Sequence, residues 1–316
     1  MELTDISKYK KDYKILDESF KVISKENKTF STGTKATVYN LEDENGMQIE
    51  AKIWNRFEEE DYHILKIEEG YVNAFRGKLE ISINKSTGER LDDMEPAEEV
   101  RENYQLIRGF IDLIEDRDYR DITSYLYEKY EEELLSIPAG YKMHHNYRGG
   151  LLEHIREVTS ISHNFTRSFP DLNQSLLMAG ALLHDIGKVK TLKISGFMPE
   201  MDIEAHMFDH LYLGTEMVKE AARELSLDLS ERKLNLLINI IGSHHNRLEY
   251  GALFRPATME AYLVYISDLS STRYNMYQKE YLANGEPDIF TMYLDDGKTS
   301  MYGRKAIDSI MEDRDL

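Results

Sequence analysis

Residues 172–188 read LNQSLLMAGALLHDIGK, an apolar run that ends in an adjacent histidine and aspartate. The apolar run predicts a helix, and Gly187 is suited to cap it, with Lys188 directly beyond. His184 and Asp185 stand at the end of this helix, where both side chains can face one cavity. Imidazole and carboxylate ligands together suit first-row divalent ions. The stretch therefore predicts a metal site within a helical domain.

Four further motifs in the same half of the chain carry histidine or aspartate. They are GGLLEH at 149–154, DHLYLG at 209–214, GSHHN at 242–246 and SDLSS at 267–271. The candidate metal ligands that they supply are His154, His210, His244, His245 and Asp268. In the adjacent pair we favour His244 as the ligand and allow His245 a supporting or phosphate-binding role.

His154 lies on a helix predicted over 151–165 and shares its face with apolar residues, so the side chain points inward. A hydrogen-bonded core histidine is the alternative to a ligand. Asp268 lies in a largely apolar helix, where either a metal ion or a buried polar network must compensate its charge. Asp185 is the natural bridge between two ions, because a carboxylate has two oxygens and an imidazole presents one free nitrogen.

Composition limits the kinds of protein that this chain can be. A length of 316 residues favours two domains, and the absence of cysteine means that a metal would be held by His, Asp and Glu. The N-terminus has no apolar signal region and no apolar stretch is long enough to span a bilayer, so we expect a cytoplasmic protein without a membrane partner. The net charge of −19 argues against nucleic acid, although bound cations can draw phosphate into an acidic pocket.

The N-terminal part has a different texture from the rest. Residues 30–84 read as short strands separated by turns, which predicts a small closed barrel of the OB type. Such barrels bind single-stranded nucleic acid by stacking bases on exposed aromatic rings. Alternation over residues 48–54 places the only tryptophan on the polar face. The candidate nucleic-acid contacts are Tyr39, Lys52, Trp54, Arg56 and Arg76, with core packing the alternative for Tyr39 and contact with the neighbouring domain for Trp54. Many lysines precede residue 36, either on a solvated segment or as a nucleic-acid contact.

The expected fold is thus a multidomain α+β protein. Residues 1–95 form the barrel, residues 96–140 a helical linker packed on the catalytic domain, and residues 141–316 an all-α metal-binding domain.

HHNYRGGLLEH, ALLHDIGK, DHLYLG, GSHHN and SDLSS, which follow a barrel-like segment, closely resemble the YhaM-type 3′-5′ exoribonucleases. These join an OB-fold domain to an HD-superfamily phosphohydrolase domain, and the resemblance covers nearly the whole chain. It implies that one ion is held by His154, His184, Asp185 and Asp268. It implies a second ion held by Asp185, His210 and His244, with Lys188 on the scissile phosphate.

In this comparison His145 and Arg148 match the histidine-rich approach to GGLLEH, where a role at the substrate phosphate or the leaving group is expected. The chain departs from the family after the last aspartate, where it reads SDLSSTRYN instead of an acidic residue followed by a small one.

The resemblance implies a metal-dependent 3′-5′ exonuclease that hydrolyses single-stranded RNA, and possibly single-stranded DNA, to nucleoside 5′-monophosphates through metal-activated water. Two divalent ions are expected, manganese first, with iron, cobalt or magnesium as alternatives. The family also implies a homo-oligomer. Two other functions stay open: an HD-domain hydrolase of nucleotides or cyclic dinucleotides, and a non-catalytic nucleic-acid-binding regulatory protein.

Overall fold

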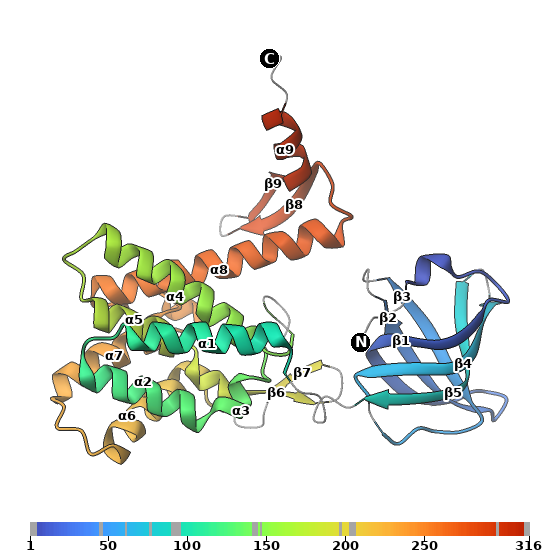
Figure 1. Cartoon of the computed structure of the whole chain (residues 1–316), viewed down its shortest axis with the longest axis horizontal. Coiled ribbons are helices and arrows are strands. Elements are labelled where there is room, and N and C mark those ends of the chain that lie inside the picture. The colour runs from blue at the N-terminus through green and yellow to red at the C-terminus, as the bar shows by residue number, and fades with distance from the viewer. Residues whose placement is uncertain are drawn as a thin grey trace. The chain divides into compact units, whose positions relative to one another are not determined.

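The computed structural model describes residues 5–43, 47–60, 62–75, 78–89, 96–140, 145, 147–195, 198–201, 207–294 and 297–312. The chain forms two compact units (Figure 1). The first holds the residues before Pro96 together with the short segment 194–198, and the second holds the remainder.

A closed five-stranded barrel makes up the first unit. After the short helix η1 (Ile6–Lys8) its strands are β1 (Lys14–Thr29), β2 (Lys35–Glu42), β3 (Gln48–Trp54), β4 (Ile64–Phe75) and β5 (Lys78–Glu89). They pair in the order β1-β2-β3-β5-β4, and β4 returns to β1. All pairs are antiparallel except the parallel pair of β3 and β5. The expected OB-type barrel is confirmed.

Strand β1 lies within the expected barrel domain of residues 1–95 but before residue 30, where the sequence pattern first indicates strands. Its buried residues Ile15, Phe20 and Val22 do not follow a simple two-residue alternation. Asp17 has a positive φ of 53°, and the pairing with β2 shifts between Val22 and Ser24. Such irregularities insert a residue into a strand and hide its period from a sequence pattern.

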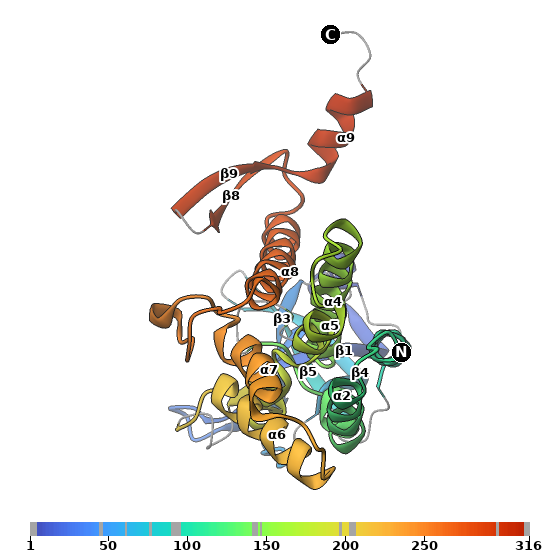
Figure 2. The same ribbon diagram turned by 90° about the vertical axis from the view of Figure 1, so that its left-hand side faces the viewer.

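The second unit is built from helices. They are α1 (Glu98–Asp112), α2 (Arg117–Lys129), α3 (Glu131–Leu134), α4 (Gly150–Ser168), α5 (Gln174–Leu183), η3 (Ile186–Lys190), α6 (His210–Glu224), α7 (Glu231–Ser243), η5 (Leu248–Tyr250), α8 (Met259–Ala283) and α9 (Arg304–Glu312). Figure 2 shows the same structure turned by 90° about the vertical axis, with α8 rising toward the C-terminal hairpin. Among its described helices, none is both long enough and apolar enough to cross a membrane.

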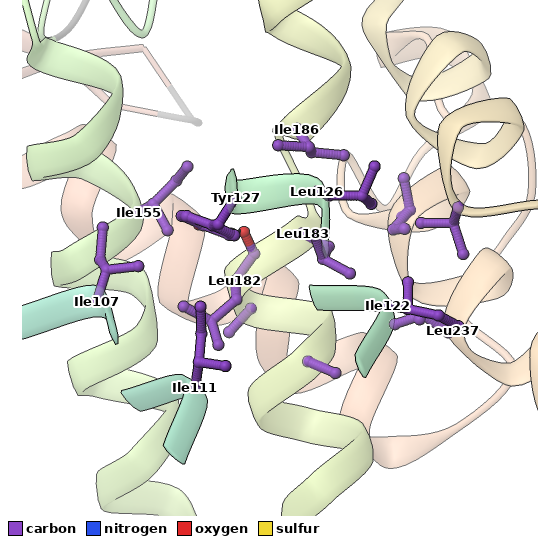
Figure 3. Close-up of a cluster of buried hydrophobic side chains, with 14 of the residues drawn as sticks. Ile107, Ile111, Ile122, Leu126, Tyr127, Ile155, Leu182, Leu183, Ile186 and Leu237 are labelled. Carbon is purple, nitrogen blue, oxygen red and sulfur yellow. Dashed lines mark hydrogen bonds between the residues drawn. The ribbon is translucent and has the colours of Figure 1, made fainter. Parts of the chain in front are cut away.

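One hydrophobic cluster joins α1 and α2 to α4, α5, α7 and α8. Figure 3 shows its centre, where Ile107 and Ile111 of α1 lie near Leu182 of α5 and Ile155 of α4. The hydroxyl of buried Tyr127 donates to the carbonyl of Leu182, which gives the only polar atom of that side chain a partner. The segment expected as a linker thus contributes side chains to the core itself.

Two hairpins outside the barrel are not predicted by the sequence pattern. They are formed by β6 (Leu192–Ser195) with β7 (Met198–Met201) and by β8 (Ile289–Leu294) with β9 (Gly297–Tyr302). Strand β8 buries Phe290 and Met292 against Tyr281 of α8, in a small cluster separate from the main core. A two-stranded hairpin is marginal alone, and this packing supports it.

Gly187 does not cap α5 with a left-handed residue, as expected from its position, but belongs to η3. Its role is close approach, because a Cβ atom at this position would lie 1.9 Å from the carbonyl oxygen of His210 and 2.6 Å from the backbone nitrogen of Gly214. Backbone atoms cannot move aside as a flexible side chain can. Gly187 therefore lets η3 pack directly on the first turn of α6.

We expect Gly187→Ala to lower the free energy of unfolding of the helical unit by about 1–3 kcal/mol, because the new methyl group overpacks two backbone atoms. Gly109→Ala is the control, since Gly109 lies within α1 with nothing within 4 Å of the added atom. That change should stabilise by roughly 0.5–1 kcal/mol. Urea unfolding followed by circular dichroism at 222 nm compares them, and equal midpoints would contradict the account.

Candidate functional site

Five histidines and two aspartates converge at one place in the helical unit, although they come from five helices. They are His154 on α4, His184 and Asp185 at the end of α5, His210 at the start of α6, His244 and His245 after α7, and Asp268 on α8. His154, His184, Asp185 and His244 are almost completely buried. The structure thus brings together all seven residues that the sequence predicts as ligands.

Asp185 lies at the centre and faces two groups of imidazoles with its two oxygens. Its Oδ2 lies 3.4 Å from Nε2 of His154 and 3.3 Å from Nε2 of His184. Its Oδ1 lies 3.2 Å from Nε2 of His210 and 3.4 Å from Nε2 of His244. A carboxylate between two sets of nitrogen donors has the geometry of a bridging ligand.

Each of the two sets of imidazoles around Asp185 has one further candidate ligand beside it. Oδ1 of Asp268 lies 3.3 Å from Nε2 of His154, on the side of Oδ2. On the other side, ring nitrogens of His210, His244 and His245 lie within 4.8 Å of one another. His245 therefore joins His210 and His244 as a candidate ligand, whereas the sequence favours His244 alone.

Hydrogen bonds at Nδ1 orient these rings. Nδ1 of His184 lies 2.8 Å from the carbonyl of Ala181, and Nδ1 of His244 lies 2.8 Å from that of Ile241. Nδ1 of His245 lies 3.0 Å from the carbonyl of Tyr250. A carbonyl can only accept, so each Nδ1 carries a proton and each neutral ring keeps a lone pair on Nε2.

His210 and His154 follow the same rule with side-chain partners. Asp209 caps α6 by accepting from the backbone of Leu211, and its Oδ1 also lies 2.8 Å from Nδ1 of His210. Nδ1 of His154 lies 3.0 Å from the hydroxyl of Ser271, which donates its own proton to Glu157 at 2.6 Å. The hydroxyl has one proton, so it must accept from His154. All five Nε2 atoms are thus the ones that would coordinate a metal ion.

This donor set fits divalent metal ions. Among the described residues, neither Oδ1 of Asp185 nor Nε2 of His210 has a hydrogen-bond partner, although both atoms are buried. Buried polar atoms without hydrogen bonds are rare because they lose their hydration without replacement. A metal ion would satisfy both atoms, and nitrogen and carboxylate oxygen are donors that such ions accept.

The charges of the site are strongly coupled. Burial alone would raise the pKa of the Asp185 carboxyl, but Lys188 and His184 hold this pKa well below its ordinary value. Burial lowers the pKa of His154, yet the carboxylates of Asp185 and Asp268 outweigh it and raise this pKa to about 9. Burial and the neighbouring His244 and His210 lower the pKa of His245 to about 3. A metal ion would therefore displace a proton from His154, while His245 is already neutral.

The sequence reading missed Glu157, Ser271 and Asp209, which orient ligands without facing the centre of the site. Ser271 lies in the SDLSS motif, and Asp209 directly precedes a candidate ligand, so their positions are visible in the sequence. Their role is not, because it depends on contacts such as that between Glu157 on α4 and Ser271 on α8. Outer residues of this kind fix ligand tautomers and tune metal affinity.

The expected catalytic residues have different surroundings. Nζ of Lys188 lies 2.6 Å from Oδ2 of Asp185, within the site. The His145 side chain is completely buried, and its Nε2 lies 3.4 Å from Glu157, so the expectation that it touches substrate was wrong. His145 packs behind His154, with ring centroids 5.3 Å apart. Arg148 is half-buried just before α4. His144 lies outside the described residues.

Two of the predicted barrel contacts are not available to a ligand. Tyr39 is wholly buried in the barrel core, so a base cannot stack on it and that prediction was wrong. Lys52 is 9% exposed, and its Nζ lies 2.7 Å from Glu50 and 2.5 Å from Glu80. Its charge is already neutralised, which argues against a direct phosphate contact.

Trp54 and Arg56 remain at the surface. Trp54 is 36% exposed on the outer face of β3, packs against Phe30 at 5.4 Å between ring centroids, and has the ammonium of Lys52 5.6 Å from its centroid. Arg56 is exposed, with Nε 2.7 Å from Glu58. Arg76 lies outside the described residues.

We expect Ser271→Ala to weaken divalent-metal affinity by about 10-fold, because Nδ1 of His154 loses its acceptor and the ring loses its orientation. Isothermal titration with Mn²⁺ measures this loss. Ser270→Ala is the matched control, since the neighbouring hydroxyl bonds only within α8, to the carbonyl of Ile266. Equal affinities in the two variants would contradict a positioning role for Ser271.

Comparisons with known proteins agree with this geometry. The HD domain family model matches residues 151–273, which contain all the candidate ligands. Curated relatives include the 3′-5′ exoribonuclease YhaM of Oceanobacillus iheyensis, 29% identical over 83% of this chain and 85% of the relative. Another is YhaM of Bacillus subtilis, 26% identical over 87% of this chain and 88% of the relative. YhaM of Listeria monocytogenes is 28% identical over 79% of this chain and 83% of the relative. The chain thus combines a closed barrel with an HD domain whose histidines and aspartates converge on Asp185, and over most of its length it is similar to the YhaM 3′-5′ exoribonucleases.

Proposed function

We propose that this protein is a metal-dependent 3′-5′ exoribonuclease that hydrolyses single-stranded RNA, with single-stranded DNA as a second candidate substrate, to nucleoside 5′-monophosphates. The observation that carries the proposal is the position of Asp185, with one oxygen toward His154 and His184 and the other toward His210 and His244. Sites with two metal ions suit phosphodiester hydrolysis because the ions stabilise negative charge on the attacking oxygen and on the leaving oxygen, which lie on opposite sides of the phosphorus. The relatives are named as 3′-5′ exoribonucleases, which supports the direction and the substrate.

Within this proposal two groups of residues would hold the ions. The first ion would be held by His154, His184, Asp185 and Asp268, and the second by Asp185, His210, His244 and His245. Manganese is the first choice, since it accepts both imidazole and carboxylate, while iron, cobalt and magnesium are alternatives. Bound ions of this kind lower the pKa of a coordinated water and stabilise negative charge at phosphorus.

The chain's own residues would prepare the substrate phosphate. Lys188, held by its 2.6 Å contact with Asp185, carries an ammonium at the edge of the site that can pair with a phosphate oxygen. Arg148, half-buried before α4, is the second candidate for a phosphate contact. His145 and Glu157 act behind His154 and hold it in place.

The barrel would bind the single strand, with Trp54 as a stacking surface and Arg56 as a cation beside it. OB-type barrels bind single strands through aromatic rings next to basic side chains. Three of the lysines of β1 and its approach are already paired with carboxylates. Lys8 lies 3.3 Å from Glu18, Lys21 lies 3.2 Å from Glu42, and Lys28 lies 2.7 Å from Glu26. Stacking is therefore the larger expected contribution on this surface.

We also propose a cytoplasmic location, where RNA turnover requires the enzyme, and a homo-oligomer. The C-terminal hairpin and α9 expose several apolar side chains, which supports self-association. They are Ile289, Tyr293, Tyr302, Ile307, Ile310 and Met311.

With Mn²⁺, the purified protein should shorten a 5′-labelled oligoribonucleotide from its 3′ end and release 5′-monophosphates. Chelation by EDTA should stop the reaction. Asp185→Asn should slow it by roughly 10²-fold or more, because a neutral amide would hold the divalent ions that stabilise the transition state less tightly than the carboxylate. Asp228→Asn, on an exposed residue of the same unit, is the control. Intact RNA with Mn²⁺ would refute the proposal.

Binding of RNA should quench the fluorescence of Trp54, the only tryptophan of the chain, in an EDTA-containing titration. We expect Trp54→Ala to weaken binding of a long oligoribonucleotide by about 10-fold and Trp54→Phe to weaken it less, because a phenyl ring still stacks. Tyr71→Ala removes another exposed ring of the barrel and serves as the control for the anisotropy measurement. The same loss for both alanine variants would exclude a specific role for Trp54.

A further inference from the structure

A cavity of about 570 Å³ opens directly after the GSHHN motif, wholly within the helical unit. Its lining consists of Asn246, Arg247, Glu249, Arg255, Pro256 and Tyr262, and we call it the arginine pocket. Its volume lies within the range of about 300–1,000 Å³ found for small-molecule sites. One nucleotide fits such a space. The sequence analysis assigns no role to these residues.

The loop that carries the pocket is held firmly in place. The backbone nitrogen of Leu253 donates to the carbonyl of Gly242 at 2.8 Å. The side chain of Asn239 donates to the carbonyl of Arg255 at 3.2 Å and accepts from the backbone of Ala257 at 2.9 Å. The pocket is therefore formed in advance, which reduces the entropic cost of binding.

The same loop joins the pocket to the candidate metal site. His245 is one of the candidate ligands, and its Nδ1 lies 3.0 Å from the carbonyl of Tyr250. Asn246 follows His245 directly, so the Cα atom of Arg247 lies no more than about 7.6 Å from that of His245. The pocket therefore begins within two residues of a candidate metal ligand, on the same loop.

Two arginines give this pocket a charge that is uncommon in a chain of net charge −19. In the described part of the chain, neither Arg247 nor Arg255 forms an ion pair with a carboxylate, whereas Lys188 and Lys233 are both held by aspartates. The guanidinium of Arg247 lies 5.7 Å from the ring centroid of Tyr250, which orients it. Arginine presents donors in a geometry that matches phosphate oxygens.

Aromatic rings lie beside these cations. Tyr262, which lines the pocket, is 44% exposed, and Tyr250 on the same loop is 64% exposed. A base can stack on such a ring whatever its identity. The Glu249 carboxylate only accepts hydrogen bonds, whereas the two arginines only donate them. It therefore suits a hydroxyl or amino donor of a nucleotide.

We propose that the arginine pocket binds one nucleotide of the RNA strand next to the scissile phosphodiester, with its phosphate on Arg247 and Arg255 and its base on Tyr262. This rests on the proposed exoribonuclease function. The pocket would hold the end of the strand while the barrel binds more distant nucleotides. Cations without carboxylate partners, an exposed ring and a preformed cavity beside the metal site support this assignment.

Photo-crosslinking tests where the strand binds. A tetraribonucleotide with 4-thiouridine at its last or second-last position is irradiated with the full chain in EDTA, which prevents hydrolysis. We expect the cross-linked residues, located by mass spectrometry, to fall between Asn246 and Tyr262. Cross-links confined to other parts of the chain would overturn the proposal.

Charge-matched variants test the arginines. Arg247→Gln and Arg255→Gln are compared with Arg232→Gln, which removes the same charge from an exposed position on α7. For the tetranucleotide, each pocket variant should bind less tightly and reduce the slope of log K against log salt by about 0.7, since one phosphate contact is lost. Tyr262→Ala should weaken binding about 10-fold, and Tyr262→Phe should restore most of it.

A small diester separates this site from the chemistry. The pocket variants should lose much more of their rate on RNA than on bis(p-nitrophenyl) phosphate with Mn²⁺, because the metal ligands are unchanged, whereas Arg232→Gln should keep both rates of the parent. Pocket variants that bind RNA like Arg232→Gln would overturn the proposal. If the parent hydrolyses no RNA, the proposed function fails, while the cross-links and salt slopes still report whether the pocket binds a strand.

Discussion

A buried carboxylate surrounded by imidazole nitrogens is the constraint on which the helical unit depends. Asp185 has a side chain that is 2% exposed, and His154, His184, His210 and His244 approach its two oxygens. An isolated carboxylate at this depth would be too costly to keep ionised. Its neighbours must therefore supply positive charge or a metal ion, and the five helices that carry them have to end or pass at one point.

The apolar core makes this convergence possible. Helix α5 is buried from Leu176 to its end at Leu183, and its neighbours pack on it from several sides (Figure 3). The core fixes the positions of the helix axes. Contacts on the far side of the candidate ligands fix the orientation of the histidine rings. Asp209, Ser271 and three backbone carbonyls each hold an Nδ1 atom, so the rings present their Nε2 atoms in common. Rigid helices with oriented side chains give a site that is set before any ion or substrate binds.

In both units, positively charged side chains pair with nearby carboxylates. Most cations with described partners are neutralised by nearby carboxylates, as Lys52 is by Glu50 and Glu80. An acidic chain can nevertheless bind RNA where cations remain without carboxylate partners, where rings are exposed, or where metal ions add charge. Arg247 and Arg255 meet the first condition, and Trp54 and Tyr262 meet the second. The distribution of charge, more than its sum, decides where phosphate can bind.

The sequence by itself determined the class of fold and the identity of the candidate ligands. Alternation in β3 and turn residues indicate a barrel, and the histidine and aspartate motifs retain their spacing whatever the packing. It did not reveal β1, because a residue with positive φ and a bulge interrupt the alternation that marks a strand. Only the tertiary structure decided that Tyr39 is core, that His145 lies behind His154, that His245 joins His210 and His244, and that Ser271 donates a hydrogen bond to Glu157. Local patterns record the face that a residue occupies, whereas these outcomes depend on which distant helix or strand meets that face.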